Sequence, residues 1–198
     1  MKQRLRISCD KYSVLMLVTM CLQGHTAQTI SLLGAAALHE CGHLLATRIF
    51  GIPLASLHIS VLGARLELRD PLLSYRREWL LCAAGPIFSF LCGGIATWLA
   101  DYGILSEELR LFAMISLALG TINLLPIGWL DGGRMFRAMC QQILPQQVAE
   151  GVLKLVSFVF FLALWMTSLY LLLRAGNSLT LFVFSFSLFL RFFLSERG

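Results

Sequence analysis

The chain has 198 residues, of which 58% are hydrophobic and 14% are charged, and its mean hydropathy is +0.77. Soluble domains are usually about 45–50% apolar and about 25% charged, so this composition excludes an ordinary soluble domain and indicates an integral membrane protein. The net charge of +5 does not indicate nucleic-acid binding, because the placement of Lys and Arg relative to the predicted spans accounts for the excess of basic residues. The six cysteines form no C-x-x-C pair and are predicted to be small core residues.

The hydrophobic segments predict an all-α polytopic membrane protein. A span needs about 20 mostly apolar residues, and six segments approach this requirement: 12–24, 28–50, 79–100, 109–127, 148–173 and 177–194. All Lys and Arg except Arg110 and Arg174 then fall on one side, which predicts cytoplasmic termini. With no repeat or low-complexity linker, we expect one domain over residues 1–198, with a retained first span and no appended soluble regulatory domain.

The connection between the second and third spans differs from the rest of the chain. Residues 57–70, "LHISVLGARLELRD", alternate between apolar and polar residues on either side of Gly63. Period two with a central glycine predicts a short β-hairpin at the inner membrane face. A simple amphipathic connector is the alternative.

The second span carries the sequence "HECGH" at positions 39–43. On a helix, His39 and His43 share one face and can bind the same zinc ion, while Glu40 is placed to take a proton from the attacking water. Zinc lowers the pKa of a bound water to about 7 and makes it a nucleophile toward a carbonyl. His and Glu inside a membrane are also costly, which favours a functional role over an incidental polar cluster.

Two histidines leave a zinc hydrolase one protein ligand short. Asp131 is the favoured third ligand because of its depth. The fourth span runs inward and is interrupted by Pro126 and Gly128, directly before Asp131. The other candidates lie at the ends of spans or in loops: Asp10, His25, His58, Asp70 and Asp101.

Together, "HECGH" and "NLLPIGWLDGG" (123–133) resemble the site-2 protease family of intramembrane zinc metalloproteases, whose later motif is N-x-x-P-x-x-x-x-D-G. The resemblance covers about residues 30–140, and the small size, six spans and "LDGGRM" look most like the family's sporulation proteases. It implies one Zn²⁺ per chain, held by His39, His43 and Asp131, with Glu40 as the catalytic general base. It also implies a substrate-binding role for Asn123, Pro126 and Gly132, and pairing of the hairpin with an unwound substrate segment.

The resemblance further implies the biological setting. We expect cleavage of a membrane-tethered regulatory protein, such as a sigma-factor precursor, near the cytoplasmic face of a bacterial cell or forespore membrane. The lipid bilayer and membrane regulatory or inhibitory proteins would be the other partners. The alternatives are a catalytically silent homologue acting as a membrane binding module, a metal transporter, or another type of H-E-x-x-H membrane protease.

One stretch departs from the family pattern. In "AAGPIFS" (83–89), Ser89 stands where the family usually has Asn, so we expect no substrate role for Ser89. Gly85 and Pro86 are predicted to allow close packing or a kink. For Asn123, a hydrogen bond between helices is the structural alternative.

Overall fold

The computed structural model describes residues 6–9, 26–52, 54–60, 63–68, 74–103, 106–175 and 186. The chain divides into two compact units, Met1–Leu125 and Pro126–Gly198. The predicted spans 12–24 and 177–194 lie outside the described residues, except for Phe186.

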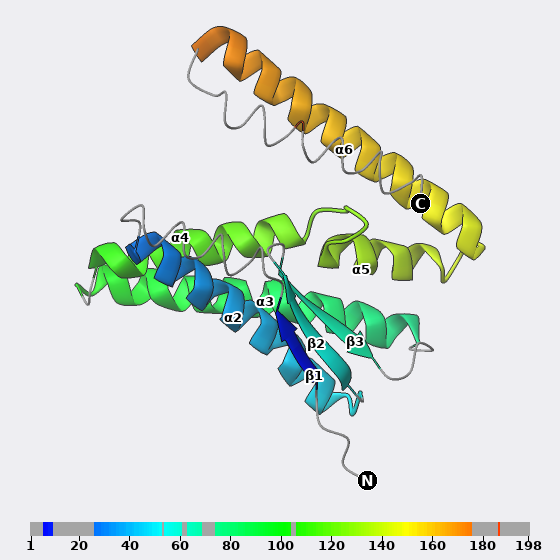
Figure 1. Cartoon of the computed structure of the whole chain (residues 1–198), viewed down its shortest axis with the longest axis horizontal. Coiled ribbons are helices and arrows are strands. Elements are labelled where there is room, and N and C mark those ends of the chain that lie inside the picture. The colour runs from blue at the N-terminus through cyan, green and yellow to red at the C-terminus, as the bar shows by residue number, and fades with distance from the viewer. Residues whose placement is uncertain are drawn as a thin grey trace. The chain divides into compact units, whose positions relative to one another are not determined.

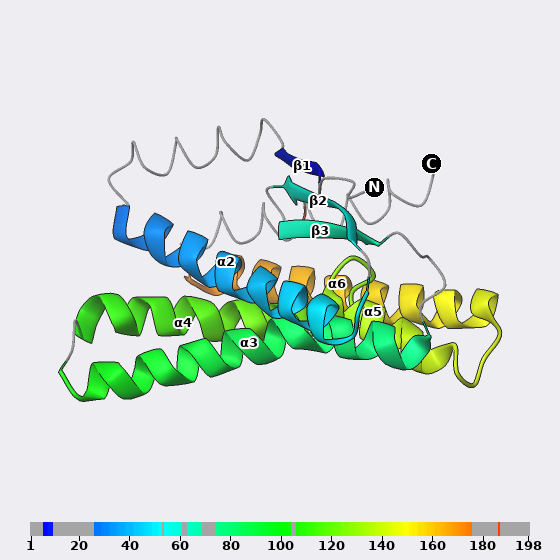
Figure 2. The ribbon, with the colours of Figure 1, turned by 90° about the horizontal axis from the view of Figure 1, so that it is seen from below.

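Three helices form the body of the first unit: α2 (Thr26–Ile49), α3 (Tyr75–Asp101) and α4 (Ser106–Asn123). They lie side by side in both ribbon views (Figures 1 and 2). Glycines lie where the helices approach each other most closely. A Cβ placed on Gly42 of α2 would lie 2.6 Å from the Ala84 carbonyl oxygen of α3, and one on Gly93 of α3 would lie 2.9 Å from Leu117 of α4. Small residues therefore let these backbones come together, as is common between membrane helices.

Helix α2 ends in a Schellman motif. Gly51 has φ of +64°, a left-handed conformation that glycine adopts without steric cost. The Ile52 N–H donates to the Thr47 carbonyl oxygen at 2.8 Å, and the Gly51 N–H donates to that of Arg48 at 3.3 Å. These two bonds satisfy carbonyl groups that the last helical turn would otherwise leave without partners.

The first unit also contains a three-stranded sheet. Its strand order is β1 (Arg6–Cys9), β2 (Leu54–Ser60) and β3 (Gly63–Leu68). The strands β2 and β3 are antiparallel, with Leu57 opposite Leu66, and they lie where the hairpin is predicted. The strand β1 pairs with β2 in parallel, which the sequence analysis did not predict. The predicted class, all-α with a short β-hairpin, did not include this third strand, because a parallel pairing between such distant segments leaves no local pattern. The location of the sheet at a membrane face stays a prediction.

The second unit contains α5 (Asp131–Cys140) and α6 (Gln146–Ala175). The predicted span 109–127 is wrong at its inner end, since α4 already ends at Asn123 and a separate short helix begins at Asp131. Pro126 lacks an N–H group and disfavours helical geometry in the residue before it. This explains why the apolar sequence continues past the point where the helix ends.

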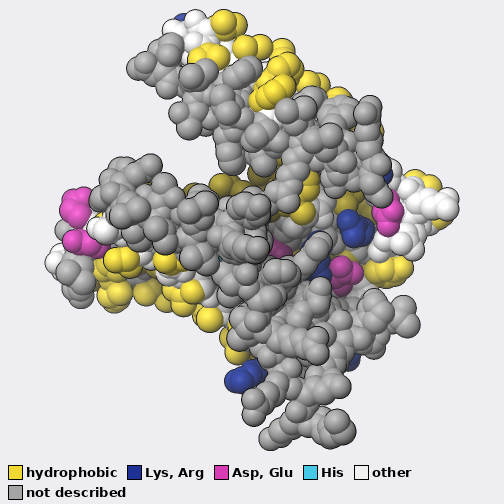
Figure 3. All heavy atoms as spheres, viewed as in Figure 1, with side chains coloured by type: hydrophobic (Ala, Val, Ile, Leu, Met, Phe, Trp, Pro, Cys, Tyr) yellow, Lys and Arg dark blue, Asp and Glu magenta, His cyan; other side chains and the backbone are white. Residues whose placement is uncertain are grey.

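Among the described residues, two helical segments are long and apolar enough to cross a membrane, Tyr75–Asp101 and Gln146–Arg174. Both expose large hydrophobic side chains, including Ile87 and Trp98 on α3 and Leu155 and Leu173 on α6. Figure 3 shows hydrophobic side chains on the surface of α6. Such surfaces are expected where helices face lipid.

Candidate metal centre

The two histidines of the H-E-x-x-H motif lie on the buried face of α2. His39 is 4% exposed and His43 is 6% exposed. They share this face with Ala35, Gly42 and Ala46 at helical spacing. Because these neighbours are small, α3 can approach the helix closely enough to contact both imidazoles.

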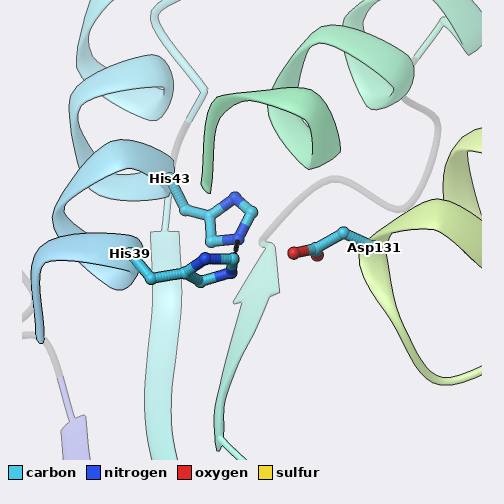
Figure 4. A group of neighbouring side chains, drawn as sticks. All are labelled: His39, His43 and Asp131. Carbon is cyan, nitrogen blue, oxygen red and sulfur yellow. Dashed lines mark hydrogen bonds between the residues drawn. The ribbon is translucent and has the colours of Figure 1, made fainter. Parts of the chain in front are cut away.

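The imidazole rings meet edge to face, with centroids 5.0 Å apart and an interplanar angle of 77° (Figure 4). Their Nε2 atoms are 3.3 Å apart. Two nitrogens bound at about 2.0–2.1 Å to one tetrahedral zinc lie about 3.3–3.4 Å from each other. The two Nε2 atoms therefore have the spacing of two ligands on one zinc ion.

The outer nitrogen of each imidazole faces a partner on α3. His43 Nδ1–H donates to the Leu81 carbonyl oxygen at 2.8 Å. A carbonyl oxygen only accepts, so Nδ1 carries the proton of His43 and the Nε2 lone pair is left for a metal. His39 Nδ1 lies 2.9 Å from Ser89 Oγ.

The Leu81 carbonyl is held in place by hydrophobic packing. The Leu81 side chain is buried against Ala46 and Ile52, with Phe50 and Ala84 packed around this cluster. The cluster joins the end of α2 to the first part of α3. It therefore fixes the hydrogen-bond acceptor that orients His43.

Gly85 of α3 faces both imidazoles. A Cβ placed there would lie 2.7 Å from His39 Nε2 and would also collide with His43 Nε2. The absence of a side chain at this position leaves the space in which the two nitrogens meet. Close packing at Gly85 was predicted from the sequence and is confirmed, but its packing against the imidazoles was not predicted.

Glu40 and Cys41 follow His39 on α2, and neither belongs to the buried residues of this helix. Glu40 is half-buried, while Cys41 is exposed. Glu40 therefore lies at the border of the buried face that carries the histidines, and its Oε2 atom is shielded from solvent. The prediction that the cysteines are small core residues is therefore wrong for Cys41.

Asn123 is the last residue of α4, in the first unit. Its Nδ2–H donates to the Leu119 carbonyl oxygen of the same helix at 3.0 Å. This bond lies within α4 rather than between helices. The proposed substrate role of Asn123 stays a prediction.

Asp131 is the first residue of α5, in the second unit. The N-terminus of a helix carries partial positive charge, which stabilises a carboxylate in the first turn. The segment before it folds back on itself, and the Leu130 N–H donates to the Ile127 carbonyl oxygen at 2.8 Å. Ser157 Oγ of α6 donates to the Pro126 carbonyl oxygen at 3.2 Å. Asp131 is therefore held by a turn that is tied to α6.

The two glycines after Asp131 are both buried. A Cβ on Gly133 would collide with the Ile127 carbonyl and would lie 2.9 Å from the Gly128 backbone nitrogen. Gly133 therefore allows the turn at 127–128 to lie against α5. The "DGG" sequence has a packing role here in addition to any role in substrate binding.

Gly133→Ala is expected to lower the free energy of unfolding by about 1–3 kcal/mol, because the added methyl group meets backbone atoms that cannot rotate away. Thermal unfolding in detergent, followed by circular dichroism, measures the effect. Gly151→Ala on α6 is the matched control, since no atom of the described residues lies within 4 Å of a Cβ there. Equal unfolding temperatures for the two variants would contradict the close approach at Gly133.

Two parts of this site were not predicted from the sequence. Ser89 was expected to have no substrate role, and its contact with His39 was not foreseen. Leu81 contributes a backbone atom, which no side-chain motif records. Leu81, Gly85 and Ser89 follow each other at intervals of four along α3. This spacing is the signal that would have placed them on one helix face.

Comparisons with known proteins match this chain to a peptidase family model, a curated relative and a solved structure. Residues 99–167 match the family model of Peptidase family M50. The chain is 27% identical over 168 residues to Stage IV sporulation protein FB of Bacillus subtilis (strain 168), an alignment that covers 82% of this chain and 57% of that protein. It therefore spans little more than half the length of this relative. The fold is similar to that of the Site-2 Protease from Methanocaldococcus jannaschii, with a TM-score of 0.67 and 20% identity over 96% of this chain and 91% of that one.

Proposed function

Since this chain is related to the M50 peptidases and shares the fold of a site-2 protease, we propose that it is an intramembrane zinc metalloendopeptidase. Its substrate would be a membrane-tethered regulatory protein, cut near the cytoplasmic face. The similarity to a sporulation protein supports a bacterial regulatory substrate such as a sigma-factor precursor. The proposal also includes a multi-pass topology with both termini in the cytoplasm, as the distribution of Lys and Arg predicts.

The paired imidazoles carry the proposal. Two buried histidines with Nε2 atoms 3.3 Å apart, each with Nδ1 facing a hydrogen-bonding atom, form half of a tetrahedral site. Burying two polar rings in a membrane protein costs free energy, so such residues are expected mainly where they serve a function. A packing role alone does not explain why Gly85 leaves room between the two nitrogens.

Asp131 is proposed as the third ligand. His39, His43 and Asp131, the side chains labelled in Figure 4, would supply two imidazoles and one carboxylate as metal donors. This donor set suits zinc, and it leaves the fourth position open as catalytic zinc sites require. The motif that contains Asp131 and its place at a helix N-terminus support this assignment.

A zinc ion at this site would polarise the scissile carbonyl and lower the pKa of an attacking water. Glu40 then accepts the proton of that water and later delivers it to the leaving amine. Asn123, Pro126 and Gly132 are proposed to bind the substrate backbone around the cleaved bond. The edge of the sheet would pair with an unwound substrate segment, because a helical peptide bond is shielded from attack.

Removal and return of the metal test the proposal directly. The full chain is purified in detergent and mixed with a membrane-tethered substrate, such as a sigma-factor precursor. We expect about one zinc per chain, loss of cleavage after treatment with a strong chelator, and recovery when zinc is added back. Mg²⁺ added instead of zinc is the control, since it prefers oxygen ligands and should not restore cleavage.

Other outcomes would favour the alternatives. Cleavage that survives complete removal of the metal would contradict the proposed chemistry. Bound zinc without cleavage of any tethered substrate would favour the binding module. Zinc that crosses a vesicle membrane containing the protein would favour the transporter.

A further inference from the structure

Ser89 supports the candidate metal site without being one of its ligands. Its Oγ lies 2.9 Å from His39 Nδ1, although the two residues are 50 positions apart in the sequence. Ser89 is 1% exposed, so water is not available to replace this hydroxyl as the partner of the imidazole. The His39 ring therefore depends on Ser89 for the hydrogen bond at its outer nitrogen.

The two histidines are supported in different ways. His43 bonds to the Leu81 backbone carbonyl, which no side-chain substitution can remove. His39 bonds to a side-chain hydroxyl, which a single substitution deletes. Ser89, which departs from the family pattern, therefore provides the one of these two hydrogen bonds that a substitution can remove.

Helix α4 holds Ser89 in its position. A Cβ placed on Gly120 would lie 3.2 Å from Ser89 Cβ. This close approach leaves little space for Ser89 to move away from His39. One face of α3 therefore contacts the histidine pair through the Leu81 carbonyl, the Gly85 backbone and the Ser89 hydroxyl.

We propose that Ser89 is a positioning residue whose hydroxyl accepts the His39 Nδ1–H and so directs the Nε2 lone pair toward the metal. This inference rests on the proposed function, because it requires that His39 is a ligand. Hydrogen bonds to the outer nitrogen of a ligating histidine fix its ring orientation and its tautomer, and losing one typically lowers metal affinity by about 10–100-fold.

Ser89→Ala is the test, with zinc affinity as the main readout. The full-length protein in detergent competes for zinc with a chromophoric chelator, and the unfolding temperature of the metal-free protein is measured in parallel. We expect zinc affinity to fall by about 10–100-fold, while the metal-free unfolding temperature falls only by the amount that the loss of one buried hydrogen bond accounts for. Ser89→Thr retains a hydroxyl and is expected to recover most of the affinity.

Ser116→Ala is the matched control. Ser116 is also 1% exposed and lies on α4, and its Oγ has no hydrogen-bond partner among the described residues, so the substitution matches Ser89→Ala in size and burial without breaking a hydrogen bond. The inference is overturned if Ser89→Ala binds zinc as tightly as the wild type, or if Ser116→Ala loses the same affinity. It is also overturned if Ser89→Ala lowers the metal-free unfolding temperature by more than the loss of one buried hydrogen bond accounts for, because Ser89 would then be a packing residue. If the wild type itself binds no zinc, the proposed function fails first.

Discussion

Glu40→Gln is expected to stop cleavage while the zinc content of the protein stays unchanged. The amide has nearly the size of the carboxylate, but it cannot accept the proton of the attacking water. General acid–base catalysis contributes about 10²–10⁴-fold to rates, so the cleavage rate should fall by this factor. Zinc analysis and a cleavage assay on the same preparation measure both properties.

The controls separate a general base from a ligand. His43→Ala removes a proposed ligand and should lose both zinc and cleavage. Glu107→Gln makes the same chemical change at an exposed position in the first turn of α4 and should retain both. Loss of zinc in Glu40→Gln would make Glu40 a ligand, and cleavage at the wild-type rate would assign the base to another residue.

Gly85→Ala is expected to abolish tight zinc binding without removing any ligand. The new methyl group would lie where His39 Nε2 and His43 Nε2 meet, so at least one imidazole must rotate away. Because a displacement of about 1 Å costs a catalytic site about 100-fold in rate, we expect cleavage to fall by at least this factor. Zinc affinity should fall as well, because the displaced imidazole no longer meets the other one. Chelator competition measures the affinity.

Gly94→Ala is the control for this change on the same helix. No atom of the described residues lies within 4 Å of a Cβ at Gly94, so the added methyl group has space. This variant should bind zinc and cleave as the wild type does, and it should be slightly more stable because Ala favours helix. Full zinc occupancy and activity in Gly85→Ala would contradict the description of Gly85 as the space between the two imidazoles.

Several parts of the fold follow from local sequence. The predicted spans 28–50, 79–100 and 148–173 correspond to α2, α3 and α6, with ends that differ by a few residues. Hydrophobic runs of this length favour helices because, inside a bilayer, every backbone N–H and C=O group must form its hydrogen bond within the segment. The α4 boundary was less predictable, because apolar residues continue past Asn123 although Pro126 prevents the helix from continuing.

The sequence by itself determined that His39 and His43 share one helix face, because their spacing of four requires only local helix geometry. Tertiary structure alone decided what surrounds them. The Leu81 carbonyl, Gly85 and Ser89 reach the imidazoles because α3 packs against the face of α2 that carries small residues, at separations of up to 50 residues. The pairing of β1 with β2 was decided in the same way. Contacts between distant segments depend on how whole surfaces fit together, and no local period or composition carries that information.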